Sequence, residues 1–151
     1  MRKRSFALVA LVVGLVALLA LTTTAAAIGG AKRSTTLSGA EEVPPADPDG
    51  TGSAFITLNA GQATVCWELT ASNIQPATAA HIHKAPAGVN GPIVVPLSPP
   101  TSGSSSGCTA ADPALIADII ENPEQYYVNV HNAEFPGGAV RGQLSNRGQF
   151  T

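Results

Sequence analysis

The sequence predicts an all-β domain, a small antiparallel Greek-key-like β-sandwich with one short helix. Three observations support this prediction. Short extended runs alternate apolar and polar residues with a period of two, turn residues separate these runs at regular spacing, and only one segment has the pattern of a helix. Charged residues make up 12% of the chain while Gly, Pro, Ser, Thr and Ala are plentiful, a mixture typical of short strands joined by many turns.

The first 27 residues are predicted to be a signal peptide. Arg2-Lys3-Arg4 precedes a charge-free apolar run over residues 6–21, which is too short to span a bilayer comfortably, and Ala25-Ala26-Ala27 forms a small-residue cleavage site. An uncleaved N-terminal anchor is the alternative. The folded domain is expected at residues 34–145 with a tail at 146–151, in a protein located outside the cell or in its envelope.

The charge of the mature chain limits its partners. Three of the eight basic residues lie in the predicted signal peptide, which leaves five basic against ten acidic residues and a net charge of −5. A mildly acidic surface argues against nucleic acid and against anionic membrane as partners, so no membrane association beyond the signal is expected. An extracellular protein partner is left open.

The predicted strands follow one another through most of the chain. The first ends at Glu41-Glu42-Val43-Pro44-Pro45, because proline cannot donate to a β-ladder. Residues 53–58 and 62–72 form a hairpin around Asn59-Ala60-Gly61. In the second of these runs the alternation buries one face, with Trp67 near its middle. The remaining strands are expected at residues 78–84, 92–97, 126–131 and 139–144.

Between these strands the sequence predicts a loop and a helix. Residues 98–107, Ser-Pro-Pro-Thr-Ser-Gly-Ser-Ser-Ser-Gly, are interpreted as a flexible polar loop. Asp112-Pro113 is typical of an N-cap followed by proline at the first helical position, and it opens a helix that runs to about Glu121. Its apolar stripe consists of Leu115, Ile116, Ile119 and Ile120.

Two cysteines, Cys66 and Cys108, are expected to form a disulfide because the count is even and the protein is predicted to be exported. The bridge would close a loop of about 43 residues and contribute roughly 4 kcal/mol in the chain-entropy model. The alternative, that both are thiolate metal ligands, lacks the support of a Cys-x-x-Cys spacing.

The three histidines of the chain lie in two predicted strands. His81 and His83 are two residues apart, so both side chains point to the same face of the sheet. If His131 faces them from a neighbouring strand, the three imidazoles could form an open site that copper or zinc accepts. Asn132 and Glu134 are candidates for a fourth ligand or for a partner of a ligand. The alternative is that the histidines form hydrogen bonds with the backbone and stabilise loops.

Arg141 is a further candidate for the site. It could hold an anion near an open metal position. Alternatively it forms a structural ion pair with Glu42, Glu68 or Glu134.

Four ordered motifs resemble those of the CHRD domain, a module named after its repeats in chordin and also found singly in exported bacterial proteins. They span about residues 35–145 and consist of Leu37–Pro45, Ala80–His83 with Gly88, Asn90 and Gly91 after it, Tyr127–His131, and Gly137–Leu144. CHRD units also resemble, more distantly, copper-zinc superoxide dismutase, with His81, His83, His131 and Arg141 in the corresponding order. This chain has no further histidine for the bridging imidazole or the histidine-rich zinc site of that enzyme.

These observations together predict an exported CHRD protein that binds one transition-metal ion through His81, His83 and His131, with copper favoured and zinc as the alternative. No catalytic residue is assigned and no catalytic cycle is expected. One alternative is an extracellular structural or interaction module whose binding face is formed by the loops 84–92 and 98–107. The other is a dismutase-like copper enzyme.

Overall fold

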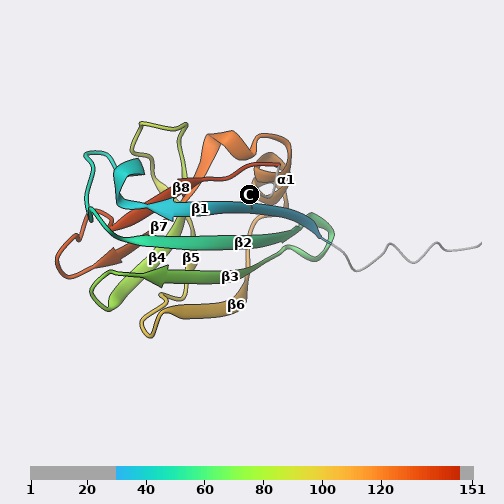
Figure 1. Ribbon diagram of the computed structural model, residues 1–151. Coiled ribbons are helices and arrows are strands. Elements are labelled where there is room, and N and C mark those ends of the chain that lie inside the picture. Colours follow the sequence, from blue (N-terminus) through green and yellow to red (C-terminus); the bar gives the residue numbers. More distant parts are fainter. Residues whose placement is uncertain (1–29, 147–151) are drawn as a thin grey trace, which may run out of the picture.

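A computed structural model describes residues 30–146 of the chain. In this part, eight strands form one antiparallel sheet in the order β5-β4-β7-β8-β1-β2-β3-β6 (Figure 1). The elements are β1 (Ala31–Ser38), η1 (Gly39–Glu41), β2 (Thr51–Asn59), η2 (Ala60–Gln62), β3 (Thr64–Ser72), β4 (Ala77–Lys84), β5 (Ile93–Leu97), β6 (Ser104–Ala110), α1 (Pro113–Glu121), η3 (Pro123–Gln125), β7 (Tyr126–Asn132) and β8 (Val140–Gln143). The predicted all-β antiparallel class is confirmed. The predicted signal peptide and residues 147–151 of the tail lie outside the described residues.

The two layers of the predicted sandwich are halves of one nearly closed sheet. The strands at its ends, β5 and β6, come into contact without forming a ladder among the described residues. The hydroxyl of Ser105 in β6 donates a hydrogen bond of 2.7 Å to the carbonyl of Ser98, just after β5. Pro96 of β5 lies opposite His81 of β4. We call the line along which β5 and β6 meet the seam.

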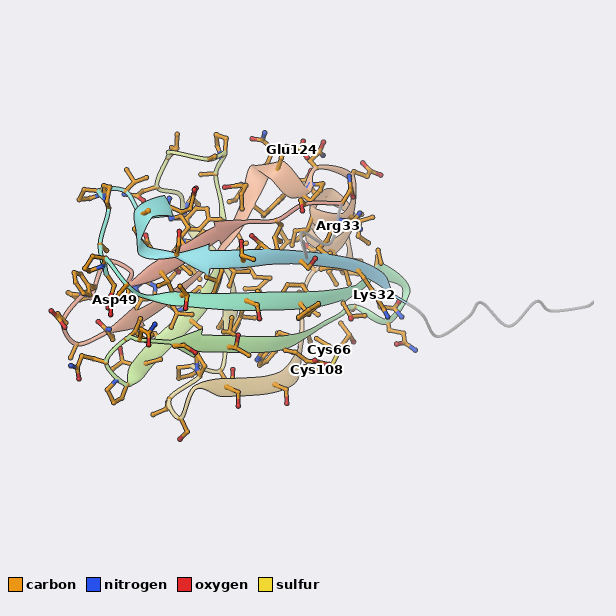
Figure 2. All side chains as sticks on the ribbon, viewed as in Figure 1. Lys32, Arg33, Asp49, Cys66, Cys108 and Glu124 are labelled. Carbon is orange, nitrogen blue, oxygen red and sulfur yellow. A yellow bond between two sulfur atoms is a disulfide. The ribbon has the colours of Figure 1, made fainter. Side chains whose placement is uncertain are left out.

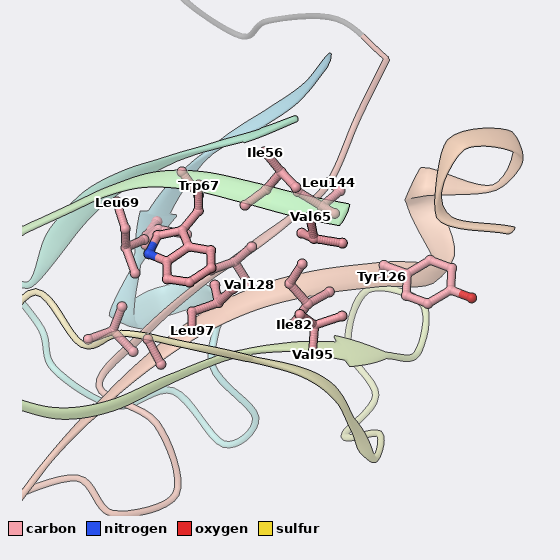
Figure 3. Close-up of a cluster of buried hydrophobic side chains, with 14 of the residues drawn as sticks. Ile56, Val65, Trp67, Leu69, Ile82, Val95, Leu97, Tyr126, Val128 and Leu144 are labelled. Carbon is pink, nitrogen blue, oxygen red and sulfur yellow. The ribbon is translucent and has the colours of Figure 1, made fainter. Parts of the chain in front are cut away.

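The core lies between the two halves of this sheet (Figure 3). Along β3, Val65, Trp67 and Leu69 are buried, while the residues between them are more accessible, which confirms the predicted period of two. On the other side, Ile82 of β4 and Val128 of β7 are fully buried. Burial of a side chain of this size contributes about 1.5–3 kcal/mol to stability. A shift of one residue would expose all of these side chains, so the alternation determines which face of each strand is turned to the core.

The prediction of a loop over residues 98–107 is wrong in its second half, because residues 104–110 form the edge strand β6. This segment lacks apolar alternation, so its strand conformation depends on pairing with β3. Gly107 permits the pairing, since a Cβ there would lie 2.8 Å from the Trp67 ring. The register places Cys108 directly opposite Cys66, and the predicted disulfide is confirmed (Figure 2).

The helix α1 begins and ends where the sequence predicts. The carboxylate of Asp112 accepts a hydrogen bond of 2.8 Å from the amide of Ala114, as an N-cap does. Asp118 accepts hydrogen bonds from the Tyr126 hydroxyl at 2.5 Å and from the Lys84 ammonium at 2.6 Å, which attaches the helix to β7 and β4. Within residues 30–146, no helix has the length and apolar character needed to cross a membrane.

Candidate metal centre

The three histidines lie together on the outer face of β4 and β7. Ile82 is fully buried on the inner face, so its neighbours His81 and His83 point outward. In the antiparallel register Asn129 lies opposite His81, and His131 lies opposite Ala79, diagonally across from His81. The predicted approach of His131 to the His-x-His pair from a neighbouring strand is therefore correct.

Hydrogen bonds define which nitrogen of each ring carries the proton. Nδ1 of His83 lies 2.9 Å from the Gly91 carbonyl, and Nδ1 of His131 lies 3.0 Å from the Pro136 carbonyl. A carbonyl only accepts, so both Nδ1 atoms are donors and both Nε2 atoms are free bases when the rings are neutral. Nδ1 of His81 lies 3.1 Å from Nε2 of His131 and therefore donates to it.

The surroundings of the rings keep them neutral. Burial lowers the pKa of His81 to about 4, and the neighbouring His131 and His83 act in the same direction. Burial also lowers the pKa of His83 and of His131, although the hydrogen bonds to Gly91 and Pro136 oppose the shift. Neutral imidazole is the form that binds metal ions, so protons compete little at neutral pH.

The geometry of the cluster is close to that of a three-histidine metal site. One nitrogen from each ring can be chosen so that all three lie within 4.8 Å of one another. Ligands near 2 Å from one tetrahedral ion lie roughly 3.4 Å apart, so the nitrogens, now up to 4.8 Å apart, would approach one another by up to about 1.4 Å on binding. His81 is the ring that can move, because within residues 30–146 its nitrogens are held by one hydrogen bond, to His131, and by no backbone carbonyl.

The buried atom that best fits a metal ligand is Nε2 of His83. His83 is 8% exposed, and this nitrogen has no hydrogen-bond partner. A buried acceptor without a partner costs free energy that a bound cation would offset. The backbone carbonyls on Nδ1 of His83 and His131 are the kind of partner that orients ligating histidines in metal sites.

His83 is held in place by a stack that extends away from the other two rings. Tyr127, opposite His83 in the register, lies parallel to it with ring centroids 4.8 Å apart. Gly91 closes this arrangement, since its carbonyl accepts from His83 and its amide donates to the Tyr127 hydroxyl at 3.2 Å. The guanidinium of Arg141 lies over the opposite face of Tyr127, 4.0 Å from the ring centroid.

Arg141 is engaged in structural contacts. Its Nε donates to Glu42 at 3.1 Å, and both side chains are buried. Its remaining nitrogens donate to the Val89 carbonyl at 3.2 Å and to the side-chain oxygen of Asn90. Of the three partners that the sequence left open, the structure selects Glu42. With these donors occupied, Arg141 anchors the loop 85–92 over the site and does not present a free fork to an anion.

The two candidates for a fourth ligand lie at the end of β7 and in the turn that follows it. The side-chain oxygen of buried Asn132 accepts from the Phe135 amide at 2.7 Å and so fixes the turn after β7. Glu134 is exposed at the tip of that turn. Among the His, Cys, Asp and Glu side chains of residues 30–146, the group that could hold a metal consists of the three histidines and does not include Glu134.

Sequence reasoning missed the contributions of Tyr127, Asn129 and Gly91 to the site. Tyr127 is not among the residues predicted for the site, although its position opposite His83 makes it a partner of the ring. Asn129 lies opposite both His81 and Arg141 and close to Glu42 and His83. The period of two in β7 places Tyr127, Asn129 and His131 on one face, and this signal could have identified them.

The family model described as "CHRD domain" matches residues 33–144. The chain belongs to the CHRD family. No curated protein and no solved structure matches the chain. The CHRD assignment supports an extracellular module, and the Cys66–Cys108 disulfide fits an oxidising compartment. The more distant likeness to copper-zinc superoxide dismutase stays a prediction.

Proposed function

We propose that this CHRD protein is exported and binds one transition-metal ion, with copper favoured, through His81, His83 and His131. The observation that carries the proposal is the convergence of three imidazoles, with one nitrogen of each within 4.8 Å of the others. Soft Cu(I) is satisfied by three nitrogens, whereas Cu(II) would add water in a more planar arrangement. Zinc, which takes three histidines and a water, is the alternative.

The chain's own residues would prepare the site in three ways. The carbonyls of Gly91 and Pro136 orient the rings of His83 and His131, and the Tyr127 stack limits rotation of His83. Burial keeps the rings unprotonated, with the pKa of His81 near 4. The ion would replace the hydrogen bond between His81 and His131, so the proton on Nδ1 of His81 would leave or move to the other ring nitrogen.

Metal analysis of the mature protein, residues 28–151, tests the proposal. The purified, oxidised protein is loaded with copper or zinc, dialysed and analysed beside a His83→Ala variant and a Glu134→Gln control. We expect one equivalent of copper in the parent and in the control, and a loss of at least tenfold in affinity in His83→Ala. Copper that remains bound after all three histidines are replaced by alanine would show that the assignment is wrong.

A binding role is favoured over a catalytic one because the residues of a complete dismutase site are missing. The chain has three histidines, and within the described part they form a single group. An open copper site could still react with superoxide, so a superoxide assay on the copper-loaded protein separates a binding protein from a dismutase-like enzyme.

A further inference from the structure

Asn129 lies between the three histidines on the outer face of the sheet. In the register it is directly opposite His81. It precedes His131 by two residues on β7, and it is diagonal to His83, which lies opposite Tyr127. Residues directly opposite on an antiparallel pair have Cβ atoms about 4.5–5.5 Å apart, and residues two apart on one strand share a face. The side chain of Asn129 is therefore a neighbour of all three imidazole rings.

The contacts of the Asn129 amide define its orientation. It forms a hydrogen bond with the Glu42 carboxylate, which only accepts, so the NH2 group of the amide faces Glu42. The oxygen, Oδ1, then lies on the other side of the amide, toward His83. Burial lowers the pKa of His83, whereas the interaction with Asn129 acts to raise it, as an acceptor oxygen beside the ring does. The amide thus presents its oxygen to the histidines.

Two neighbouring buried acceptors lack a donor. Asn129 is 1% exposed, and within residues 30–146 its Oδ1 has no hydrogen-bond partner. Nε2 of His83 is also buried without a partner, because the ring proton is on Nδ1, toward the Gly91 carbonyl. Both atoms have lone pairs and neither has a hydrogen to share, so each is left unsatisfied by the other. A metal ion bound by Nε2 of His83 would satisfy both acceptors at once.

An amide oxygen added to three imidazoles changes which ion the site prefers. Oxygen ligands suit the harder divalent ions, and both Zn(II) and Cu(II) combine them with histidine nitrogens. Cu(I) is softer and is satisfied by three nitrogens, so it gains little from an amide oxygen. Three nitrogens and one oxygen also complete the tetrahedral set of zinc, and a complete set is typical of sites that hold an ion without an open position for a substrate.

We propose that Asn129 is the fourth ligand of the site, through Oδ1, and makes it selective for a divalent ion, Zn(II) or Cu(II), over Cu(I). This inference rests on the proposed function, since the histidines must bind the ion. Asn129 takes the role for which the sequence suggested Asn132 or Glu134. The Glu42 carboxylate, paired with Arg141 at 3.1 Å, holds the NH2 group of the amide. The buried ion pair thereby keeps the oxygen turned toward the rings.

Affinities of the mature protein for Zn(II), Cu(II) and Cu(I), measured by competition with chelators, test the proposal. Asn129→Leu keeps the size of the side chain and removes its oxygen. We expect its affinity for Zn(II) and Cu(II) to fall about tenfold or more, and that for Cu(I) less than about threefold. The control Glu134→Gln should change none of the three. Equal losses for all three ions in Asn129→Leu would mean that Asn129 only positions His83, and would overturn the proposal.

Nuclear magnetic resonance of the parent protein decides the question even if Asn129→Leu does not fold. The asparagine side chains are labelled with ¹³C, and one equivalent of Zn(II) is added. We expect the side-chain carbonyl signal of Asn129 to shift, while that of Asn132, whose oxygen accepts from the Phe135 amide, stays in place. Zinc bound with the Asn129 signal unmoved would overturn this inference and leave the proposed function intact. A parent that binds no more metal than His83→Ala would overturn both.

Discussion

At the scale of single residues, the polar face of β4, β7 and β8 brings together two groups that are rarely buried. One is the three neutral histidines, and the other is the ion pair of Arg141 and Glu42. Tyr127 lies between them, stacked on His83 and covered by the Arg141 guanidinium. The histidines and the ion pair are therefore parts of one packed layer. Both contact the loop 85–92, His83 through Gly91 and Arg141 through Val89 and Asn90.

The stability of the metal-free protein should fall when the pH is lowered from about 6.5 toward 4. The pKa of all three histidines is lowered in the fold, to about 4 for His81. In this window the unfolded chain therefore binds more protons than the folded one, and acid favours unfolding. Glu42 acts in the opposite direction, because burial raises its pKa. Urea unfolding at pH 7.0, 5.5 and 4.5 measures the slope, which should be smaller in His81→Gln.

Loss of the Arg141 side chain should be costly. In Arg141→Met the carboxylate of Glu42 stays buried without its counter-charge, and we expect a loss of about 3–5 kcal/mol in the free energy of unfolding. The double variant Glu42→Gln/Arg141→Met should recover part of this loss, because the buried charge is removed. Chemical denaturation of the three proteins is the measurement. A double variant less stable than Arg141→Met would contradict this account.

At the scale of elements, the alternation along each strand made most of the fold predictable. β2, β3, β4, β7 and α1 carry strong apolar patterns, and the structure has them close to the predicted positions. β6 has no such pattern. Its strand conformation depends on pairing with β3, on Gly107, which leaves room for the Trp67 ring, and on Cys108, which lies opposite Cys66. The histidine cluster was predictable because the His-x-His spacing places both side chains on the same face of a strand. The partner of Arg141 was not, because the sequence offered three glutamates for the ion pair. The stack on Tyr127 depends on the register between strands, which the sequence of one strand does not contain.

The disulfide should contribute most of the stability of the β3–β6 pair. The Cys66→Ser/Cys108→Ser variant removes a cross-link between residues 42 positions apart, and we expect a loss of roughly 4 kcal/mol in the free energy of unfolding. Reduction of the parent protein should give a similar loss, as measured by denaturation with and without a reductant. If the reductant destabilises the variant as well, the effect does not come from this bridge.

At the scale of the whole molecule, the nearly closed sheet carries its candidate metal ligands and its buried ion pair on the outer side of β4, β7 and β8. The histidines lie on outward faces of β4 and β7, and the ion pair comes from the neighbouring β8 and the loop after β1. Loops on a rigid sheet can carry binding residues without disturbing the core.

Bound copper should stabilise the entire fold if it binds only the folded chain. At a free copper concentration one hundred times the Kd, linkage gives an increase of about 2.7 kcal/mol in the free energy of unfolding. Thermal unfolding of the parent with and without copper measures the shift. In His83→Ala, with its affinity lowered at least tenfold, the shift at the same copper concentration should be about half as large or smaller. A shift of equal size in that variant would place the copper elsewhere.

The seam between β5 and β6 affects the tendency of the protein to self-associate at high protein concentration. Unpaired edges invite strands of neighbouring molecules and can seed aggregation. Here one edge carries Pro96, which has no amide hydrogen to donate. The other edge, Ser104–Ala110, consists of small residues without a large apolar side chain. Each edge also shields the other, because β5 and β6 are in contact. A protein built this way can leave its sheet unclosed and still avoid edge-to-edge association with its own copies.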